Sequence, residues 1–219
     1  MASELYKKVL QANQEMFDRN VGMYHQRVKD AHQRYLFPFV QSFVQALKGK
    51  VVLDLGCGTG RELLYFQKLG LEAMGVDCSK EMVNHCLQKN LKVMQKDFMS
   101  LSLPPCSFDG IWSYTSLTLV PREIFLEMII QSAQWLKPQT GIFALGMIEG
   151  IEQGWKIDRT YQMPKYNARY SSKQLEEMVG SYFDILSLER VADPAKPGKF
   201  FLHLIGRNKA FYTRLGHKL

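Results

Sequence analysis

Short apolar runs alternate with segments of helical periodicity through the middle of the chain. The apolar runs lie at 51–55, 73–77, 91–95, 110–114 and 142–147. Each has the length of a buried strand. Between them, residues 59–69 and the segment after Pro121 carry apolar positions at helical spacing, and a proline suits the first turn of a helix. This alternation predicts a parallel sheet with crossover helices.

The two ends of the chain depart from that alternation. Residues 1–48 have apolar positions at near-helical spacing and predict two helices, the second ended by Gly49. Near the other end, Ser171 and Gln174 predict a capping box at the start of a helix. Two last strands are expected at 183–191 and 199–205. The proline- and glycine-containing segment between them predicts an antiparallel hairpin.

Residues 149–170 have no clear period and predict a long irregular loop. A loop of this length in a compact domain is usually functional, so we expect it to contact the substrate. The predicted organisation is an N-terminal helical extension over 1–48, an α/β domain over 49–208 and a tail over 209–219.

Composition fits one globular α/β domain. The chain has 219 residues, of which 46% are hydrophobic and 22% charged. Four cysteines show neither a C-x-x-C pair nor the spacing of metal ligands. They fit free thiols in a reducing compartment, and we expect a cytoplasmic protein without a metal. The N-terminus does not read as a signal peptide, and no apolar run approaches the length of a membrane span.

The net charge is +7 and the pI is about 9.2, which raises nucleic acid as a partner. The basic residues are scattered except near the C-terminus. The cluster there comprises Arg207, Lys209, Arg214 and Lys218. We interpret the excess charge as a solvated surface and a basic tail, so nucleic acid is not the favoured partner. The oligomeric state is left open.

A glycine turn follows the first apolar run and carries the clearest chemical signal. Three glycines at alternate positions, Gly56, Gly58 and Gly60, follow residues 51–55. Glycine is the residue that lets backbone approach a ligand closely. Asp77 ends the next apolar run, 21 positions after Gly56. A glycine turn followed about 20 residues later by an acid is a nucleoside-binding arrangement, in which the carboxylate takes ribose hydroxyls.

The details of the turn disfavour a dinucleotide. Its fingerprint requires G-x-G-x-x-G, whereas here the third glycine comes one position early and Arg61 stands in its place. Asp54 beside the turn would repel a pyrophosphate. It suits a ligand that has a ribose, an adenine and a cationic amine, as S-adenosylmethionine does.

Residues 54–60, Asp-Leu-Gly-Cys-Gly-Thr-Gly, resemble motif I of the class I S-adenosylmethionine-dependent methyltransferases. The resemblance extends over about 24–207, through 75–82, 96–98, 108–113 and 136–141. It implies a Rossmann-like seven-stranded sheet of order 3-2-1-4-5-7-6. Strand seven would be antiparallel, helices would cover both faces, and the N-terminal helices would form a lid. The implied cofactor is S-adenosyl-L-methionine, with S-adenosyl-L-homocysteine as product.

The resemblance also implies roles for particular residues. Asp77 would bind both ribose hydroxyls, Asp97 the adenine amino group, and the Phe98 amide a ring nitrogen. Tyr24 stands where similar chains have a lid tyrosine. The cofactor-binding residues implied are Tyr24, Asp54, Gly56, Cys57, Gly58, Gly60, Asp77, Cys78, Met82, Asp97, Phe98 and Ser113. Alternatives stay open, because Asp97 also suits a helix cap, Tyr24 simple packing, and Cys57 a small residue in the turn.

The acceptor side is less defined. Residues 113–116, Ser-Tyr-Thr-Ser, replace the Asn-Pro-Pro-Tyr or Asp-Pro-Pro-Tyr that signals methylation of a base or amide nitrogen. Leu119 stands where a related Leu-His-Val-Pro segment has its histidine, so a histidine base is not expected there. The candidate acceptor-site residues are Ser113, Tyr114, Glu149, Glu152 and Arg169. The last three residues also suit a structural ion cluster that pins the loop, and we slightly favour this second interpretation.

We expect methyl transfer to a small-molecule acceptor by in-line displacement. Such a reaction depends mainly on proximity and orientation, and needs a base only if the acceptor is protonated. An RNA or protein methyltransferase is the alternative suggested by the charge. A non-catalytic protein that binds S-adenosylmethionine or a partner is the alternative suggested by the missing histidine.

Overall fold

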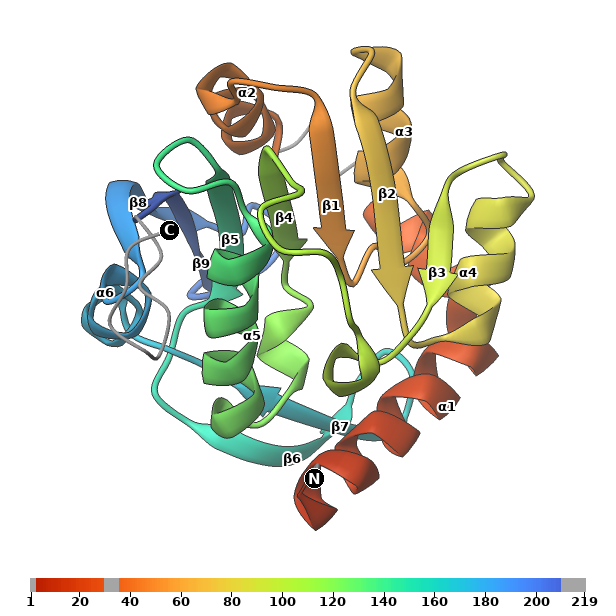
Figure 1. Cartoon of the computed structure of the whole chain (residues 1–219). Helices are drawn as coiled ribbons and strands as arrows, with labels where there is room; N and C mark the ends of the chain where they lie inside the picture. The colour runs from red at the N-terminus through yellow and green to blue at the C-terminus, as the bar shows by residue number, and fades with distance from the viewer. Residues whose placement is uncertain (1–2, 30–35, 210–219) are drawn as a thin grey trace.

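A seven-stranded mixed sheet forms the centre of the computed structural model, which describes residues 3–29 and 36–209 (Figure 1). Its strands are β1 (Val51–Leu55), β2 (Glu72–Asp77), β3 (Val93–Gln95), β4 (Gly110–Tyr114), β5 (Ile142–Ile148), β8 (Phe183–Ala192) and β9 (Phe200–Asn208). The order is β3-β2-β1-β4-β5-β9-β8, and β9 is antiparallel to both of its neighbours. This is the predicted order, in which the seventh strand of the sheet along the chain, β9, is antiparallel, and it confirms the fold class.

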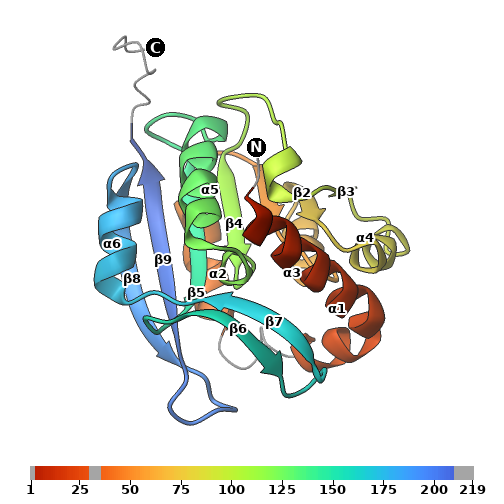
Figure 2. The same cartoon turned by 90° about the horizontal axis from the view of Figure 1, so that it is seen from below.

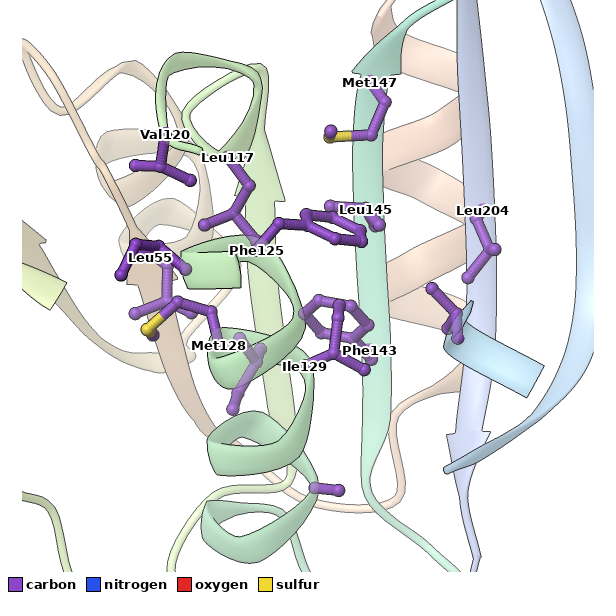
Figure 3. Close-up of a cluster of buried hydrophobic side chains, with 14 of the residues drawn as sticks. Leu55, Leu117, Val120, Phe125, Met128, Ile129, Phe143, Leu145, Met147 and Leu204 are labelled. Carbon is purple, nitrogen blue, oxygen red and sulfur yellow. The ribbon is translucent and has the colours of Figure 1, made fainter. Parts of the chain in front are cut away.

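Helices cover both faces of the sheet. They are α1 (Glu4–Val28), α2 (Phe37–Ala46), α3 (Arg61–Lys68), α4 (Lys80–Leu87), α5 (Arg122–Trp135) and α6 (Ser172–Gly180), with short 3-10 turns η2 (Phe98–Ser100) and η3 (Leu117–Leu119). On one face, Phe125 and Ile129 of α5 pack toward Phe143 and Leu145 of β5 (Figure 3). On the other, Phe39 and Phe43 of α2 contact Trp112 of β4. Burial of these apolar side chains is the main stabilising contribution.

Helix α1 lies across the carboxyl ends of the central strands, together with a hairpin described below (Figures 1 and 2). Ser3 caps its first turn by accepting from the Tyr6 amide. Asn20 interrupts the helix with a non-helical backbone, φ −126° and ψ 20°. Asp18 accepts hydrogen bonds from the Ser79 hydroxyl and the Glu81 amide at the start of α4. These bonds fix α1 over the edge where parallel sheets bind their ligands.

The prediction of an irregular loop at 149–170 is wrong. This stretch contains an antiparallel hairpin of β6 (Gln153–Asp158) and β7 (Met163–Ala168). Asp158 closes the turn by accepting from the amides of Thr160 and Tyr161. Tyr166 of β7 is buried in the main core. The hairpin therefore packs against the domain through β7, while most positions of β6 are exposed, Trp155 and Ile157 among them.

Smaller differences concern the ends of elements. Helix α2 ends at Ala46, because Leu47 is already extended with ψ 140°, and Gly49 lies in the connection to β1. The Cβ that Gly49 lacks would lie 2.3 Å from the Asp109 carboxyl, so this glycine is required for space. Strand β9 runs on to Asn208, three residues further than predicted.

Most of the predicted basic tail, including Arg214 and Lys218, lies outside the described residues. Within the described residues, no helix has the length and apolar character needed to cross a membrane.

Candidate functional site

The glycine turn after β1 is a tightly folded cradle of backbone, in which alternate positions carry no side chain. Gly56, Gly58 and Gly60 have φ values of 76°, 53° and 74°, which side chains with a Cβ rarely adopt. The amides of Gly56 and Cys57 donate to the Val76 carbonyl at 2.8 and 3.0 Å. A Cβ on Gly56 would lie 2.2 Å from that of Ser116. Conformation and close approach both demand glycine here, as the sequence predicts.

Asp77, at the end of β2, is fixed beside this turn. Its Oδ2 accepts from the Gly58 amide at 2.8 Å, and its Oδ1 accepts from the Ser79 amide at 2.9 Å. Burial raises the pKa of Asp77, while the hydrogen bonds from Ser79 and Gly58 oppose that rise. The carboxylate therefore stands next to the glycine turn, with one backbone amide on each oxygen.

Asp54 lies at the base of the turn, with 2% of its surface exposed. Its Oδ2 has no hydrogen-bond partner within the described ranges. Burial raises the pKa of Asp54 well above its usual value, and Glu62 adds to this, while Arg61 opposes it. A buried carboxyl oxygen without a donor costs free energy until a donor or cation reaches it.

A cavity of about 640 Å³ opens between the glycine turn, α1 and the β6–β7 hairpin. Of the predicted site residues, Tyr24, Gly56, Gly58, Asp77, Cys78, Met82, Phe98, Tyr114 and Arg169 line it. Others of that set lie outside the lining: Asp54, Cys57, Gly60, Asp97, Ser113, Glu149 and Glu152. The structure thus brings together most of the predicted cofactor residues, whereas three of the five predicted acceptor residues, Ser113, Glu149 and Glu152, lie outside the cavity lining.

Asp97 acts as a helix cap. Its Oδ1 accepts from the amides of Met99 and Ser100 in η2, at 2.9 and 3.2 Å. The same oxygen accepts from the Tyr6 hydroxyl of α1 at 3.2 Å. The neighbouring Phe98 lines the cavity, so Asp97 lies beside the site. Its Oδ1 already accepts hydrogen bonds from the protein itself.

Tyr24 lies over the glycine turn. A Cβ on Gly58 would come within 3.2 Å of the Tyr24 ring and 3.3 Å of its hydroxyl oxygen. Burial raises the pKa of Tyr24. The Arg27 guanidinium lies 5.7 Å from the ring centre, within the range of a cation–π contact. Tyr24 therefore both packs on the domain and forms part of the cavity wall.

Ser113 supports the backbone rather than facing the cavity. Its hydroxyl lies 2.8 Å from that of Ser116, which donates to the Leu55 carbonyl at 2.6 Å. Tyr114, the next residue of β4, lines the cavity, and its hydroxyl lies 3.4 Å from Nε2 of His203. Burial lowers the pKa of His203 to about 4, so this imidazole is neutral at pH 7.

The two predicted glutamates form separate ion pairs. Glu152 binds Arg169 with an N–O distance of 2.8 Å. Glu149 instead accepts from Nε of Arg190, with both carboxylate oxygens at 2.9 Å. A single cluster of Arg169 with both glutamates is therefore wrong, because Arg190, on β8, takes one of them. No group of side chains in the described part of the chain is arranged to hold a metal ion.

Several cavity residues were not predicted from the sequence. Helix α1 contributes Tyr6, Leu10, Asn13 and Phe17, and the hairpin and the segment before β9 contribute Lys156, Lys165, Asn167 and Lys199. The signal for the first group is its helical spacing, which places these residues on one face of α1. The signal for the second group is weak, because it depends on recognising a hairpin within a polar stretch.

Residues 52–139 match a family model described as a methyltransferase domain. This segment runs from β1 through the glycine turn, Asp77 and β4. The chain contains a methyltransferase domain over these residues. No curated protein matches the sequence of this methyltransferase.

Solved structures of low sequence identity share the fold of this methyltransferase. A DhpI–SAH complex is 17% identical, with a TM-score of 0.73 over 96% of this chain and 100% of that one. The 1,6-didemethyltoxoflavin-N1-methyltransferase of Burkholderia thailandensis, with S-adenosylhomocysteine bound, is 17% identical, with a TM-score of 0.70 over 95% and 92%. The [4+2]-cyclase SpnF is 21% identical, with a TM-score of 0.62 over 80% of each chain. The fold thus serves more than one reaction, and the acceptor has to be argued from this chain's own cavity.

Proposed function

We propose that this methyltransferase transfers the methyl group to a small-molecule acceptor held in the cavity beneath α1 and the β6–β7 hairpin. The observation that supports this is the cavity itself, whose volume of about 640 Å³ is of the size that small-molecule sites have. Both covering elements belong to the same chain and lie across the carboxyl ends of the strands (Figure 2). A covered site of this kind suits a ligand that is enclosed, rather than a macromolecule that lies on a surface.

The cofactor fits the end of the cavity formed by the glycine turn. Gly56 and Gly58 line this end of the cavity without side chains, and Asp77 beside them suits the ribose hydroxyls. The apolar side chains of Met82 and Phe98 suit an adenine ring. The unpartnered Oδ2 of Asp54 beneath the turn suits a cationic amine, directly or through water.

Asp97 and Ser113 have supporting roles in this proposal. The cap that Asp97 forms at η2 places the Phe98 backbone and ring at the cavity. Ser113, through Ser116, holds the end of β4 against the Leu55 carbonyl of β1. Both residues would then act on cofactor binding through the geometry of their neighbours.

S-adenosylmethionine supplies an activated methyl group and a good leaving group. The chain's part is to align the acceptor atom and to exclude water, which are the tasks of proximity and enclosure. Tyr24 and Tyr6 of α1 close the cavity from one side, and Lys165 and Asn167 of β7 close it from the other. The neutral His203 lies behind the Tyr114 hydroxyl, next to the cavity wall.

The first test is calorimetry with S-adenosylmethionine and S-adenosylhomocysteine, with NAD as the control ligand. We expect saturable binding of the first two and none of NAD. The cofactor-loaded enzyme is then screened against small-molecule and RNA acceptors by release of S-adenosylhomocysteine. Turnover with RNA or protein substrates alone would overturn the small-molecule proposal.

A further inference from the structure

The end of the cavity formed by the hairpin is rich in cations. Lys156 on β6 and Lys165 on β7 are direct cross-strand partners, and both line the cavity. Like charges directly opposite each other destabilise a sheet. Packing of the hairpin does not explain why two lysines face each other here. An anion bound between the two ammonium groups would offset their repulsion.

Further cations face the same space. Arg27 of α1 and Lys199, which directly precedes β9, also line the cavity, and the Arg27 guanidinium lies 4.9 Å from the centre of the Tyr161 ring in the hairpin turn. These residues come from three separate elements, so the gathering of positive charge is a property of the tertiary structure.

The acids of the cavity do not balance these charges. Among the described lining residues, the acids at this end are Asp158 and Asp193. Asp193 binds Lys199 at 2.9 Å, whereas Asp158 lies 3.5 Å from Lys165 and uses its other oxygen to close the hairpin turn. The side chain of Lys165 is only 14% exposed, so water compensates its charge poorly. Burial lowers the pKa of Lys165 to about 8, which leaves it mostly protonated at neutral pH.

A buried, unsatisfied donor lies beside these lysines. Asn167 is 5% exposed and lines the cavity, and its Nδ2 has no hydrogen-bond partner within the described ranges. It is two positions after Lys165 on β7, so the two side chains point to the same face of the strand. The residue opposite Asn167 is Gly154, where a Cβ would meet nothing within 4 Å. Space for a ligand therefore adjoins a donor that lacks an acceptor.

We propose that the acceptor of this methyltransferase carries an oxyanion group, a carboxylate or a phosphonate-type group, which binds to Lys156, Lys165 and the Nδ2 of Asn167. This assignment rests on the proposed function, since it names the class of acceptor for the same cavity. An oxyanion supplies several acceptor oxygens and adds negative charge between two facing lysines, of which Lys165 has a long contact of 3.5 Å to Asp158. It leaves each of the three donors paired.

The test is calorimetry of three matched probes: benzoate, phenylphosphonate and the neutral benzamide. Each is titrated into the protein alone and into the protein loaded with S-adenosylhomocysteine. We expect saturable binding of at least one oxyanion at millimolar concentration or below and none of benzamide. The two oxyanions distinguish a carboxylate site from a phosphonate site.

Variants locate the binding. Lys165→Met and Asn167→Leu should each weaken oxyanion binding about tenfold or more, because each removes a hydrogen bond to a charged group. Lys156→Met changes an exposed position and should weaken it without affecting folding. The control is Lys173→Met on α6, which has the same charge change at a side chain 84% exposed and far from the cavity lining. Its oxyanion affinity should equal that of the unmodified protein.

The outcomes separate this inference from the proposed function. Three results would overturn the inference and leave the proposed function standing, provided that S-adenosylhomocysteine binds. They are no binding of either oxyanion, binding of benzamide equal to that of benzoate, or oxyanion affinity unchanged in Lys165→Met and Lys156→Met. Oxyanion binding that depends on these lysines, with no binding of S-adenosylhomocysteine, would support the anion site and contradict the proposed function.

Discussion

The amide of Gly58 donates to Oδ2 of Asp77 at 2.8 Å, which joins the turn after β1 to the end of β2. One carboxylate thereby holds the glycine cradle in shape and stands at the edge of the cavity. A change at Asp77 should affect both the cradle and any ligand in it.

Replacing Asp77 with alanine should weaken binding of S-adenosylhomocysteine by about 1–3 kcal/mol, because charge-assisted hydrogen bonds are lost. Calorimetry measures this loss. The affinity of Asp77→Asn, which keeps the size of the side chain, should lie between those of the unmodified protein and Asp77→Ala. Unchanged affinity in Asp77→Ala, with a normal melting temperature, would contradict the assignment of this acid to the ribose.

Gly58→Val should abolish cofactor binding, since its side chain would fill the space between the turn and Tyr24. The matched control is Gly70→Val, because Gly70 also has a positive φ, 74°, but has nothing within 4 Å of a Cβ. Both variants should lose about 1–2 kcal/mol of stability from backbone strain. Only the first should lose binding of S-adenosylhomocysteine, and equal affinity in both would place the cofactor elsewhere.

The buried His203 makes stability depend on pH. Burial lowers its folded pKa to about 4 from the ordinary 6.5, so the unfolded chain binds a proton in that interval while the folded chain does not. Its stabilising contribution is therefore complete above pH 6.5 and is lost as the pH falls toward 4. The loss should reach about 3 kcal/mol. Urea unfolding between pH 4 and 6.5 should show this loss in the unmodified protein and not in His203→Phe, which keeps a ring against Phe39. The same dependence of unfolding free energy on pH in both proteins would contradict the prediction.

Asn208 joins β9 to the end of α5. Its Nδ2 donates to the carbonyls of Ala133, Leu136 and Lys137, at 2.9, 3.1 and 3.3 Å. Asn208→Ala should lower the free energy of unfolding by about 2–3 kcal/mol, because buried carbonyls lose their donor. Denaturant unfolding is the measurement. The neighbouring Arg207→Ala, at a half-exposed ion pair with Asp184, should change it by less than about 1 kcal/mol.

Much of the sheet could be predicted from the sequence, because its central strands are buried on both faces and read as unbroken apolar runs. The bounds of β1 and β4 match the predicted runs, and the capping box of Ser171 and Gln174 is present in the structure. The glycine turn was predictable for a different reason. Its backbone needs glycine at fixed positions, and a carboxylate follows at a fixed distance.

The hairpin could not be predicted in the same way. Its strands carry Gly154, Pro164 and several charges, and they bury few side chains, so they lack the alternation by which strands are recognised. The partners of long charged side chains were equally hidden. Nothing near Glu149 in the sequence points to Arg190, 41 positions away, which the pairing of β8 with β9 and of β9 with β5 brings close.

The hairpin also gives the protein an optical probe at the cationic end of the cavity. Of its three tryptophans, Trp112 and Trp135 are buried, whereas Trp155 is 46% exposed. Trp155 precedes Lys156 on β6 and contacts Tyr166 edge to face, with 5.6 Å between ring centres. The long-wavelength part of the intrinsic fluorescence therefore originates next to the cationic end of the cavity, where no label has to be introduced.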